Sequence, residues 1–256
     1  MLAPRIIPSL LIKNGGLVKT TNFQEPRYIG DPINAVRIFN EKEVDELVVL
    51  DIDASADNRE PNYEVIEHLA AECRMPLCYG GGVKTAEQVV KIVKLGVEKV
   101  AMSSAIIERP QLISEAAEMV GNQSIVAVID VKRVNQQYRA FTFNGSVNTG
   151  ESPFELAKRF AEIGAGEIVV NSIDGDGVMQ GYDFELVEEM KNNIRVPLTV
   201  LGGAGSLDDI KALFARFRQL GAAAGSLFVY KGKYRAVLIN YPSPEQKRDI
   251  ENFNDR

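Results

Sequence analysis

The feature that most constrains the fold of this chain is an internal repeat. Residues 44–49 resemble residues 165–170, so that Glu46 lies 121 positions before Glu167. The same spacing relates several further pairs along the chain: Asp31-Pro32 with Ser152-Pro153, Phe39 with Phe160, Pro76-Leu77 with Pro197-Leu198, and Gly81-Gly82 with Gly202-Gly203. Repetition at a fixed period is the signature of a duplicated architecture. The chain is therefore expected to consist of two homologous halves, at about residues 1–120 and 121–242.

Within each half, short β-branched runs alternate with segments of helical period, which is typical of parallel β/α units. The expected strands begin near Ile6, Leu47, Leu77, Val100, Ile125, Ile168, Leu198 and Gly221. Thr85 and Ser152 begin predicted capping boxes, Pro153 suits a first helical position, and Ser206 begins another helix. Eight such units predict a TIM (β/α)8 barrel of the α/β class over residues 1–242, followed by a polar C-terminal tail at 243–256. An open doubly wound sheet, the alternative fold, normally needs fewer strands and one glycine fingerprint.

Composition excludes several classes of protein. The formal charge of −6 is opposite to the basic face of a nucleic-acid-binding protein. No apolar run approaches the roughly 18 residues of a membrane span, so no membrane is expected and the chain is predicted to be cytoplasmic. Cys73 and Cys78 have neither metal-ligand nor disulfide-framework spacing. No metal and no cofactor are therefore expected.

Glycines at the ends of predicted strands indicate where a ligand binds. Gly81-Gly82 ends the third strand and Gly202-Gly203 ends the seventh, and a helix begins shortly after each pair. Backbone N–H groups at such points suit a phosphate, although a single pair is more often just a tight turn. Each pair has hydroxyl partners one strand later, at Ser103-Ser104 and at Gly225-Ser226. The repetition favours two phosphate sites and a substrate phosphorylated at both ends.

Acidic residues gather at the same predicted end of the barrel. The repeat aligns residues 10–13 with residues 129–132, which sets Leu11 opposite Asp130, so only the second half carries a carboxylate there. Asp176-Gly177 follows the sixth strand, beside the second predicted phosphate site. The segment from Asn14 to Gly30 has no period and is expected to be a structureless lid that carries Lys19 to a substrate anion.

Four charged residues stand at or near the starts of predicted strands and alternate in sign. They are Arg5, Glu46, Lys99 and Glu167. In a barrel they converge on its bottom opening, where unpaired charge costs free energy, so two cross-barrel ion pairs are expected. Their spacing alone does not distinguish a structural plug from a functional ring.

Taken together, these motifs resemble one family over residues 1 to about 230. The segments that carry the resemblance are 5–7, 45–47, 80–82, 127–133, 166–168, 172–177 and 202–205. They are similar to HisF, the cyclase subunit of imidazole glycerol phosphate synthase. The resemblance implies a heterodimer in which a HisH-like glutaminase docks on the barrel bottom. It also implies that ammonia passes a gate formed by Arg5, Glu46, Lys99 and Glu167 on its way to a bisphosphorylated substrate.

The chain departs from that family at three places. The family uses two aspartates as general acid and base; Asp130 matches one of them, but Leu11 occupies the position of the other, and loss of one partner should severely weaken the cyclase reaction. Ser103 stands where the family usually has asparagine. The C-terminal stretch 225–242 looks instead like that of HisF-like proteins encoded with surface-polysaccharide genes.

That second resemblance implies ammonia delivery for converting acetamido to acetamidino sugars, with a third, ATP-dependent amidotransferase protein as a further partner. Two rival functions stay open. One is a true cyclase of histidine biosynthesis, which Asp130, Lys19 and both phosphate sites favour. The other is a phosphosugar isomerase of the related HisA type, which needs the same paired acids and no charged gate.

Overall fold

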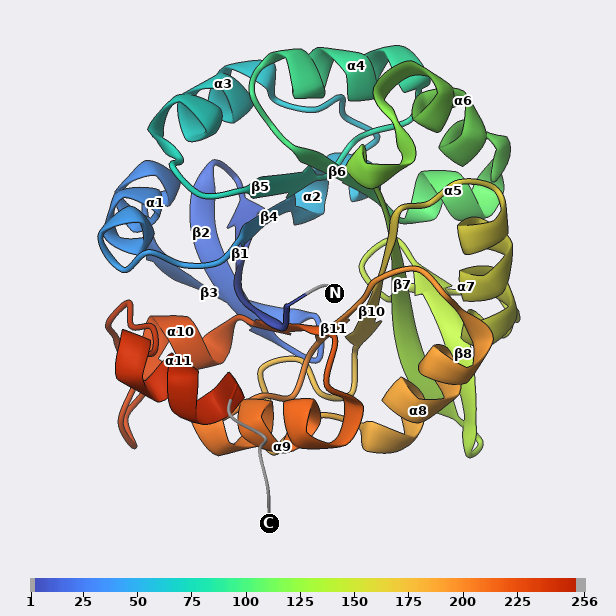
Figure 1. Ribbon diagram of the computed structural model, residues 1–256. Coiled ribbons are helices and arrows are strands. Elements are labelled where there is room, and N and C mark those ends of the chain that lie inside the picture. Colours follow the sequence, from blue (N-terminus) through green and yellow to red (C-terminus); the bar gives the residue numbers. More distant parts are fainter. Residues whose placement is uncertain (1–2, 252–256) are drawn as a thin grey trace.

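The computed structural model describes residues 3–251, and its ribbon is a closed ring of strands surrounded by helices (Figure 1). The eight strands of the ring are β1 (Arg5–Lys13), β4 (Leu47–Asp51), β5 (Leu77–Gly80), β6 (Lys99–Met102), β7 (Ile125–Val134), β10 (Glu167–Ser172), β11 (Leu198–Leu201) and β12 (Gly221–Ala224). Neighbouring strands are parallel, and pairing of β10 with β7 and of β12 with β1 closes the ring. The chain is thus a (β/α)8 barrel, and every strand begins within one residue of its predicted start.

The outer layer is formed by the helices that follow the strands. The longer ones are α1 (Pro32–Glu41), α3 (Tyr63–Glu72), α4 (Ala86–Lys94), α6 (Gln111–Val120), α7 (Pro153–Glu162), α8 (Phe184–Asn193), α9 (Leu207–Phe217) and α11 (Pro244–Glu251). The short ones are α2 (Ile52–Ala56), α5 (Ser104–Glu108), α10 (Ser226–Val229) and the 3-10 turn η1 (Asn122–Ser124). The capping box at Thr85 is confirmed, and Ser206 caps α9 in the same way. The box predicted at Ser152 is wrong because that side chain makes no capping hydrogen bond, although Pro153 does begin α7.

Part of the predicted polar C-terminal tail is a helix that packs against the barrel. Residues 244–251 form α11, whose Ile250 is buried and whose Lys247 forms an ion pair with Asp45, two residues before β4. The segment therefore packs against the barrel, and the rest of the predicted tail, 252–256, lies outside the described residues. Within residues 3–251, no helix combines the length and apolarity that crossing a bilayer requires.

The core has two layers, as a barrel requires. The larger layer lies between strands and helices and includes Phe39 and Phe160, which are partners in the repeat and fully buried. The smaller layer fills the barrel interior with side chains such as Ile7, Cys78 and Ala223. The interior is therefore packed and largely apolar.

The lid predicted as structureless is in fact a β-hairpin. Strands β2 (Gly16–Thr21) and β3 (Gln24–Gly30) continue antiparallel from the end of β1. Asn14 and Gly15 have φ values of 49° and 76°, which is the backbone of an Asn-Gly hairpin turn. The second half contains an equivalent antiparallel extension, since β8 (Gln137–Thr142) and β9 (Val147–Asn148) extend β7 in the same way. Two hairpins thus flank the mouth of the barrel.

Candidate functional site

A pocket lies at the carboxyl ends of the strands, and all eight barrel strands contribute to its wall. It brings together nearly all the residues predicted at strand ends: Leu11, Lys19, Gly81, Ser103, Ser104, Asp130, Asp176, Gly177, Gly202, Gly203, Gly225 and Ser226. Gly82 is the exception. Its N–H donates to the hydroxyl of Ser55 (3.2 Å), and a Cβ there would lie 2.7 Å from the carbonyl oxygen of Arg59. Gly82 therefore supports the loop from behind.

Glycine is required by the backbone at both predicted phosphate loops. Gly81 has φ +125°, and a Cβ would lie 2.4 Å from the carbonyl oxygen of Asp51. Gly203 has φ +114°, and a Cβ would lie 2.1 Å from the carbonyl oxygen of Gly181. The loops are thus tight turns packed on neighbouring backbone, and Gly81, Gly202 and Gly203 line the pocket ahead of α4 and α9.

Leu11 and Asp130 occupy equivalent positions in the two halves. Leu11 pairs with Leu50 of the next strand and with Val18 of its hairpin, while Asp130 pairs with Asn171 and with Phe141. The side chain of Asn171 donates a hydrogen bond to the Asp130 carboxylate (3.0 Å). One side of the pocket therefore presents two leucines where the other presents a hydrogen-bonded polar pair.

Asp130 is the acid whose surroundings most alter its chemistry. Burial raises the pKa of Asp130 to about 6, and the nearby Asp176 adds to this, whereas the Asn171 hydrogen bond opposes it. The Ser103 hydroxyl also favours the charged form of Asp130, yet it is buried and meets no partner at hydrogen-bond geometry among the described residues. A carboxyl group with a pKa near 6 can both accept and donate a proton near neutral pH.

Lys19 lies inside the pocket on the hairpin strand β2. Its Nζ donates to the carbonyl oxygen of Ser9 (2.5 Å), and its side chain is buried. Burial lowers the pKa of Lys19 to about 8, although the negative charge of Asp176 opposes the shift. A Cβ added to Gly225 would come within 2.2 Å of Lys19 Nζ, so the ammonium lies directly against the end of β12.

Asp176 fixes the hairpin on the pocket. Its carboxylate accepts hydrogen bonds from the Thr20 hydroxyl (2.6 Å) and from the backbone N–H of Phe23 (3.1 Å). Gly177 packs against the carbonyl oxygen of Thr20, where a Cβ would lie at 2.2 Å. No local sequence pattern indicates this contact, because it joins the loop after β10 to a hairpin in the other half of the chain.

The other acids at this rim serve local structure. Asp51 caps α2 through the N–H groups of Asp53 and Ala54, and Asp53 forms an ion pair with Lys13 (3.0 Å). Asp174 accepts a hydrogen bond from the N–H of Arg133 (2.8 Å). No group of three or more His, Cys, Asp or Glu side chains in the described part of the chain is placed to hold a metal ion.

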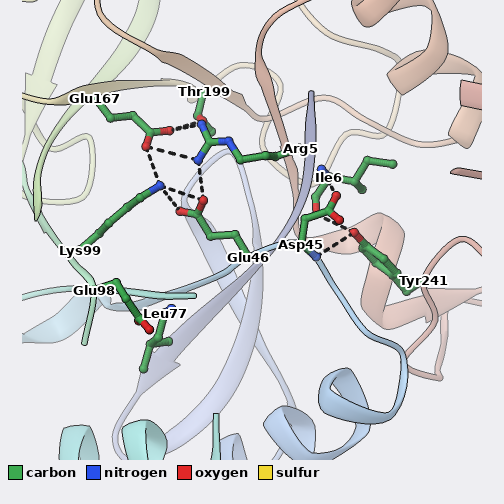
Figure 2. A network of polar contacts seen from close by, with 10 residues as sticks. All are labelled: Arg5, Ile6, Asp45, Glu46, Leu77, Glu98, Lys99, Glu167, Thr199 and Tyr241. Atoms are coloured by element: carbon green, nitrogen blue, oxygen red, sulfur yellow. Dashed lines mark hydrogen bonds and ion pairs between the residues drawn. The ribbon is translucent and has the colours of Figure 1, made fainter. Parts of the chain in front are cut away.

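At the opposite end of the barrel, the four predicted charges form a closed ring (Figure 2). Arg5 contacts Glu46 and Glu167 (Nη2–Oε1 2.7 Å), and Lys99 contacts the same two acids, each at 2.8 Å. The prediction of two cross-barrel pairs is therefore wrong in detail, because each acid contacts both cations. The hydroxyl of Thr199 completes the ring by donating to Glu167 (2.5 Å).

Mutual attraction favours the charged forms of Glu167 and Lys99 despite their burial. Burial disfavours the charged form of Glu167, but Arg5 and Lys99 hold its pKa below the usual value. Burial likewise opposes the charge on Lys99, while the two glutamates raise its pKa. Glu46 and Glu167 are 4% and 5% exposed, so removal of one member would leave its partners charged in a poorly solvated place.

A second network adjoins the ring and ties the C-terminal segment to it (Figure 2). The hydroxyl of Tyr241 donates to the carbonyl oxygen of Ile6 (2.8 Å) and accepts from the N–H of Asp45 (3.2 Å). Asp45 in turn accepts from the N–H of Ile6 (2.8 Å). Ile6 and Asp45 are the chain neighbours of Arg5 and Glu46, so this network holds the backbone from which two ring members project.

The fold and the two ends of the barrel define a (β/α)8 protein with a polar pocket above and a charged ring below. Comparison with known proteins identifies the family to which this barrel belongs. A model of the family described as "Histidine biosynthesis protein" matches residues 5–235. A Vibrio vulnificus protein provisionally named imidazole glycerol phosphate synthase subunit hisF3 is 56% identical over 97% of this chain and 96% of its own length.

Two further relatives extend the comparison. A Pseudomonas aeruginosa protein provisionally named subunit hisF2 of the same synthase is 53% identical over 94% of this chain and 97% of its own length. The imidazole glycerol phosphate synthase subunit HisF of Streptomyces coelicolor is 43% identical over 87% of this chain and 88% of its own length. The chain belongs to the HisF family, whose members are named as subunits of a synthase.

Proposed function

We propose that this chain is the barrel subunit of a glutamine amidotransferase that delivers ammonia for amidation of an acetamido sugar in surface-polysaccharide (O-antigen) biosynthesis. The glutaminase is a HisH-like protein docked at the barrel bottom, and a third, ATP-dependent amidotransferase protein takes part. The observation that carries the proposal is the combination of Leu11 at the mouth with an intact charged ring at the base.

The ring supports passage of ammonia because it closes the bottom of the barrel with groups that can separate. Each cation is shared between two carboxylates, so displacing Lys99 still leaves Arg5 in contact with Glu46 and Glu167. Above the ring, the interior is lined by apolar side chains such as Val48 and Val169. Neutral ammonia crosses such a lining at less cost than ammonium, since burial penalises the charged form.

The residues at the barrel mouth support the proposal that cyclase activity is reduced in this chain. Asp130 has a pKa suited to proton transfer, but the equivalent position on the facing side carries Leu11 next to Leu50. A leucine can neither accept nor donate a proton. A positioned acid or base contributes typically about 10²- to 10⁴-fold to rate, so the cyclase reaction should be weak in this chain.

The second candidate is the cyclase subunit of histidine biosynthesis, a lyase. It is favoured by Asp130, by Lys19 in the pocket and by the names of the relatives. Cyclase turnover by the unaltered chain at the rates of ordinary HisF proteins would establish it and would remove the sugar proposal.

The gate is tested with the HisH-like glutaminase as partner. We expect the unaltered chain to stimulate glutamine hydrolysis and Glu46→Ala/Lys99→Ala to lower the fraction of ammonia that reaches coupled amidation. The matched control is Glu151→Ala/Arg159→Ala, which removes an ion pair whose side chains are 41% and 44% exposed. An unchanged coupled fraction in the gate variant, or no stimulation by the unaltered chain, would refute ammonia delivery.

A further inference from the structure

A small hairpin between α10 and α11 carries positive charge that the rest of the described chain does not neutralise. Its strands are β13 (Tyr230–Lys231) and β14 (Ala236–Val237). Among residues 3–251, the side chains of Lys231, Lys233 and Arg235 form no ion pair with a carboxylate. The chain as a whole has a formal charge of −6, so this hairpin is a local positive surface on an acidic protein.

The same hairpin also exposes large apolar side chains. Tyr234, Val237 and Leu238 are 88%, 46% and 50% exposed, and they make up three of the seven large apolar side chains that are exposed in residues 3–251. Exposed apolar side chains gathered in one place are typical of a surface that a partner covers. Protein interfaces combine such aromatic and aliphatic anchors with a surrounding polar rim, which the lysines of the hairpin would supply.

Contacts with neighbouring segments fix the position of the hairpin. The backbone N–H of Leu238 donates to the carbonyl oxygen of Val229 at the end of α10 (2.9 Å). On the other side, Cζ of Arg27 in β3 lies 5.6 Å from the centre of the Tyr230 ring. A surface that is already ordered binds a partner at a lower entropic cost than a mobile loop does.

The hairpin lies on the outer side of the loops that form the barrel mouth. A side-chain N–H of Arg235 donates to the carbonyl oxygen of Gly177, which lines the mouth pocket (3.1 Å). A separate surface cavity is lined by Arg235 together with Lys231 and Lys233. The other walls of this cavity include residues of the mouth loops: Met179, Gly205 and Leu227. A protein bound on the hairpin would therefore adjoin the mouth, at the end of the barrel opposite the charged ring.

We propose that this cationic hairpin is the docking surface for the protein that accepts the ammonia, and that this partner presents acidic side chains around an apolar centre. The inference rests on the proposed function, which places the glutaminase at the barrel bottom and leaves the mouth for the acceptor. Acidic side chains of the partner lie in the hairpin cavity, and Tyr234 and Leu238 are buried in the contact. The docked partner excludes water from the mouth, so ammonia is transferred before solvent protonates it.

Two other occupants match the hairpin less closely. A second copy of this chain would bring the same cations to a symmetric contact, where like charges oppose association. An anionic membrane is typically bound by clusters of about four to eight cations, whereas this hairpin has only Lys231, Lys233 and Arg235. An acidic protein surface meets neither difficulty.

Binding between purified proteins tests the docking surface. The complex of this chain with the HisH-like glutaminase is titrated with the ATP-dependent amidotransferase protein in a calorimeter, at low and at high salt. We expect Tyr234→Ala/Leu238→Ser to weaken binding about tenfold or more, because it removes the apolar anchors. Lys231→Gln/Lys233→Gln should weaken binding about 2- to 30-fold at low salt, the range for two exposed ion pairs, and should reduce the loss of affinity with added salt.

The matched control is Lys158→Gln/Lys211→Gln, which removes the same charge from exposed positions on α7 and α9 and should leave the affinity within about twofold. Equal weakening in this control would attribute the effect to net charge and overturn the proposal. Hairpin variants that bind the amidotransferase protein as tightly as the unaltered chain would overturn the docking surface alone. Absence of binding by the unaltered chain would overturn the docking surface and the proposed function together.

The other occupants are tested with the chain alone. Sedimentation would detect self-association that Tyr234→Ala/Leu238→Ser abolishes, and this result would assign the hairpin to a second copy. Flotation with vesicles of equal parts phosphatidylcholine and phosphatidylserine would detect membrane binding that Lys231→Gln/Lys233→Gln abolishes. Either result would overturn the proposal. We expect a monomer that stays unbound to these vesicles.

Discussion

The raised pKa of Asp130 makes a quantitative prediction about stability. The folded chain holds this proton with a pKa of about 6, against an ordinary value of 3.8. Because the folded state binds the proton more tightly than the unfolded state, stability falls as pH rises between these values and stays low above them. One pKa unit corresponds to about 1.4 kcal/mol, so the ionised carboxylate costs up to about 3 kcal/mol above pH 6. Asp130→Asn does not titrate and keeps an oxygen for the Asn171 hydrogen bond.

We therefore expect Asp130→Asn and the unaltered chain to have similar free energies of unfolding at pH 4. At pH 7.5 the variant should be more stable by about 2–3 kcal/mol, which for a chain of this size raises Tm by roughly 4–12 °C. Urea unfolding at both pH values measures the difference, with Asp249→Asn on the exposed side of α11 as the control. An equal difference in the free energy of unfolding between variant and unaltered chain at the two pH values would show that folding does not raise the pKa of the Asp130 carboxyl.

Three further outcomes are expected. Glu167→Gln leaves Arg5 and Lys99 short of a buried partner and should lower the free energy of unfolding by about 3–5 kcal/mol in urea titrations; a loss below about 1 kcal/mol would contradict the closed ring. Gly225→Ala has a suitable φ of −101° but displaces the Lys19 ammonium, so calorimetry should detect weaker binding of inorganic phosphate with little change in Tm. Phosphate affinity of the unaltered chain should fall as pH rises through about 8, where Lys19 loses its proton, and a Lys19→Met variant with the same pH dependence would exclude Lys19 as the cause.

The barrel could be predicted from sequence because its signals are repeated. Strands such as β4 and β10 carry apolar runs at a common spacing, and the same repeat aligns the acids where these runs begin, Glu46 and Glu167. The hairpin of β2 and β3 replaces the expected structureless loop because its turn, Asn14-Gly15, consists of two residues that favour positive φ, a local signal that hydrophobic period does not include. That dipeptide between two apolar runs is the signal that could have identified β2 and β3.

The sequence predicts where in the barrel the site lies better than it predicts which side chains contact one another there. Glycines and acids at strand ends converge because parallel strands place their carboxyl ends at one face of a barrel. The hydrogen bond from Asn171 to Asp130 cannot be predicted from local sequence. Asn171 lies inside the strand run 168–172, and its position there does not indicate which residue its amide contacts. Its alignment with Leu50 through the repeat was the available clue.

We propose that this barrel retains the ammonia gate while Leu11 removes half of the acid/base pair. The most direct measurement is turnover of the histidine-pathway bisphosphate with ammonium by the unaltered chain and by Leu11→Asp, with Leu50→Asp as the neighbouring control. We predict at least about 10²-fold faster turnover in Leu11→Asp, from a very low rate in the unaltered chain, and no such gain in Leu50→Asp. Turnover by the unaltered chain equal to that of Leu11→Asp would contradict the claim and identify the protein as a working cyclase.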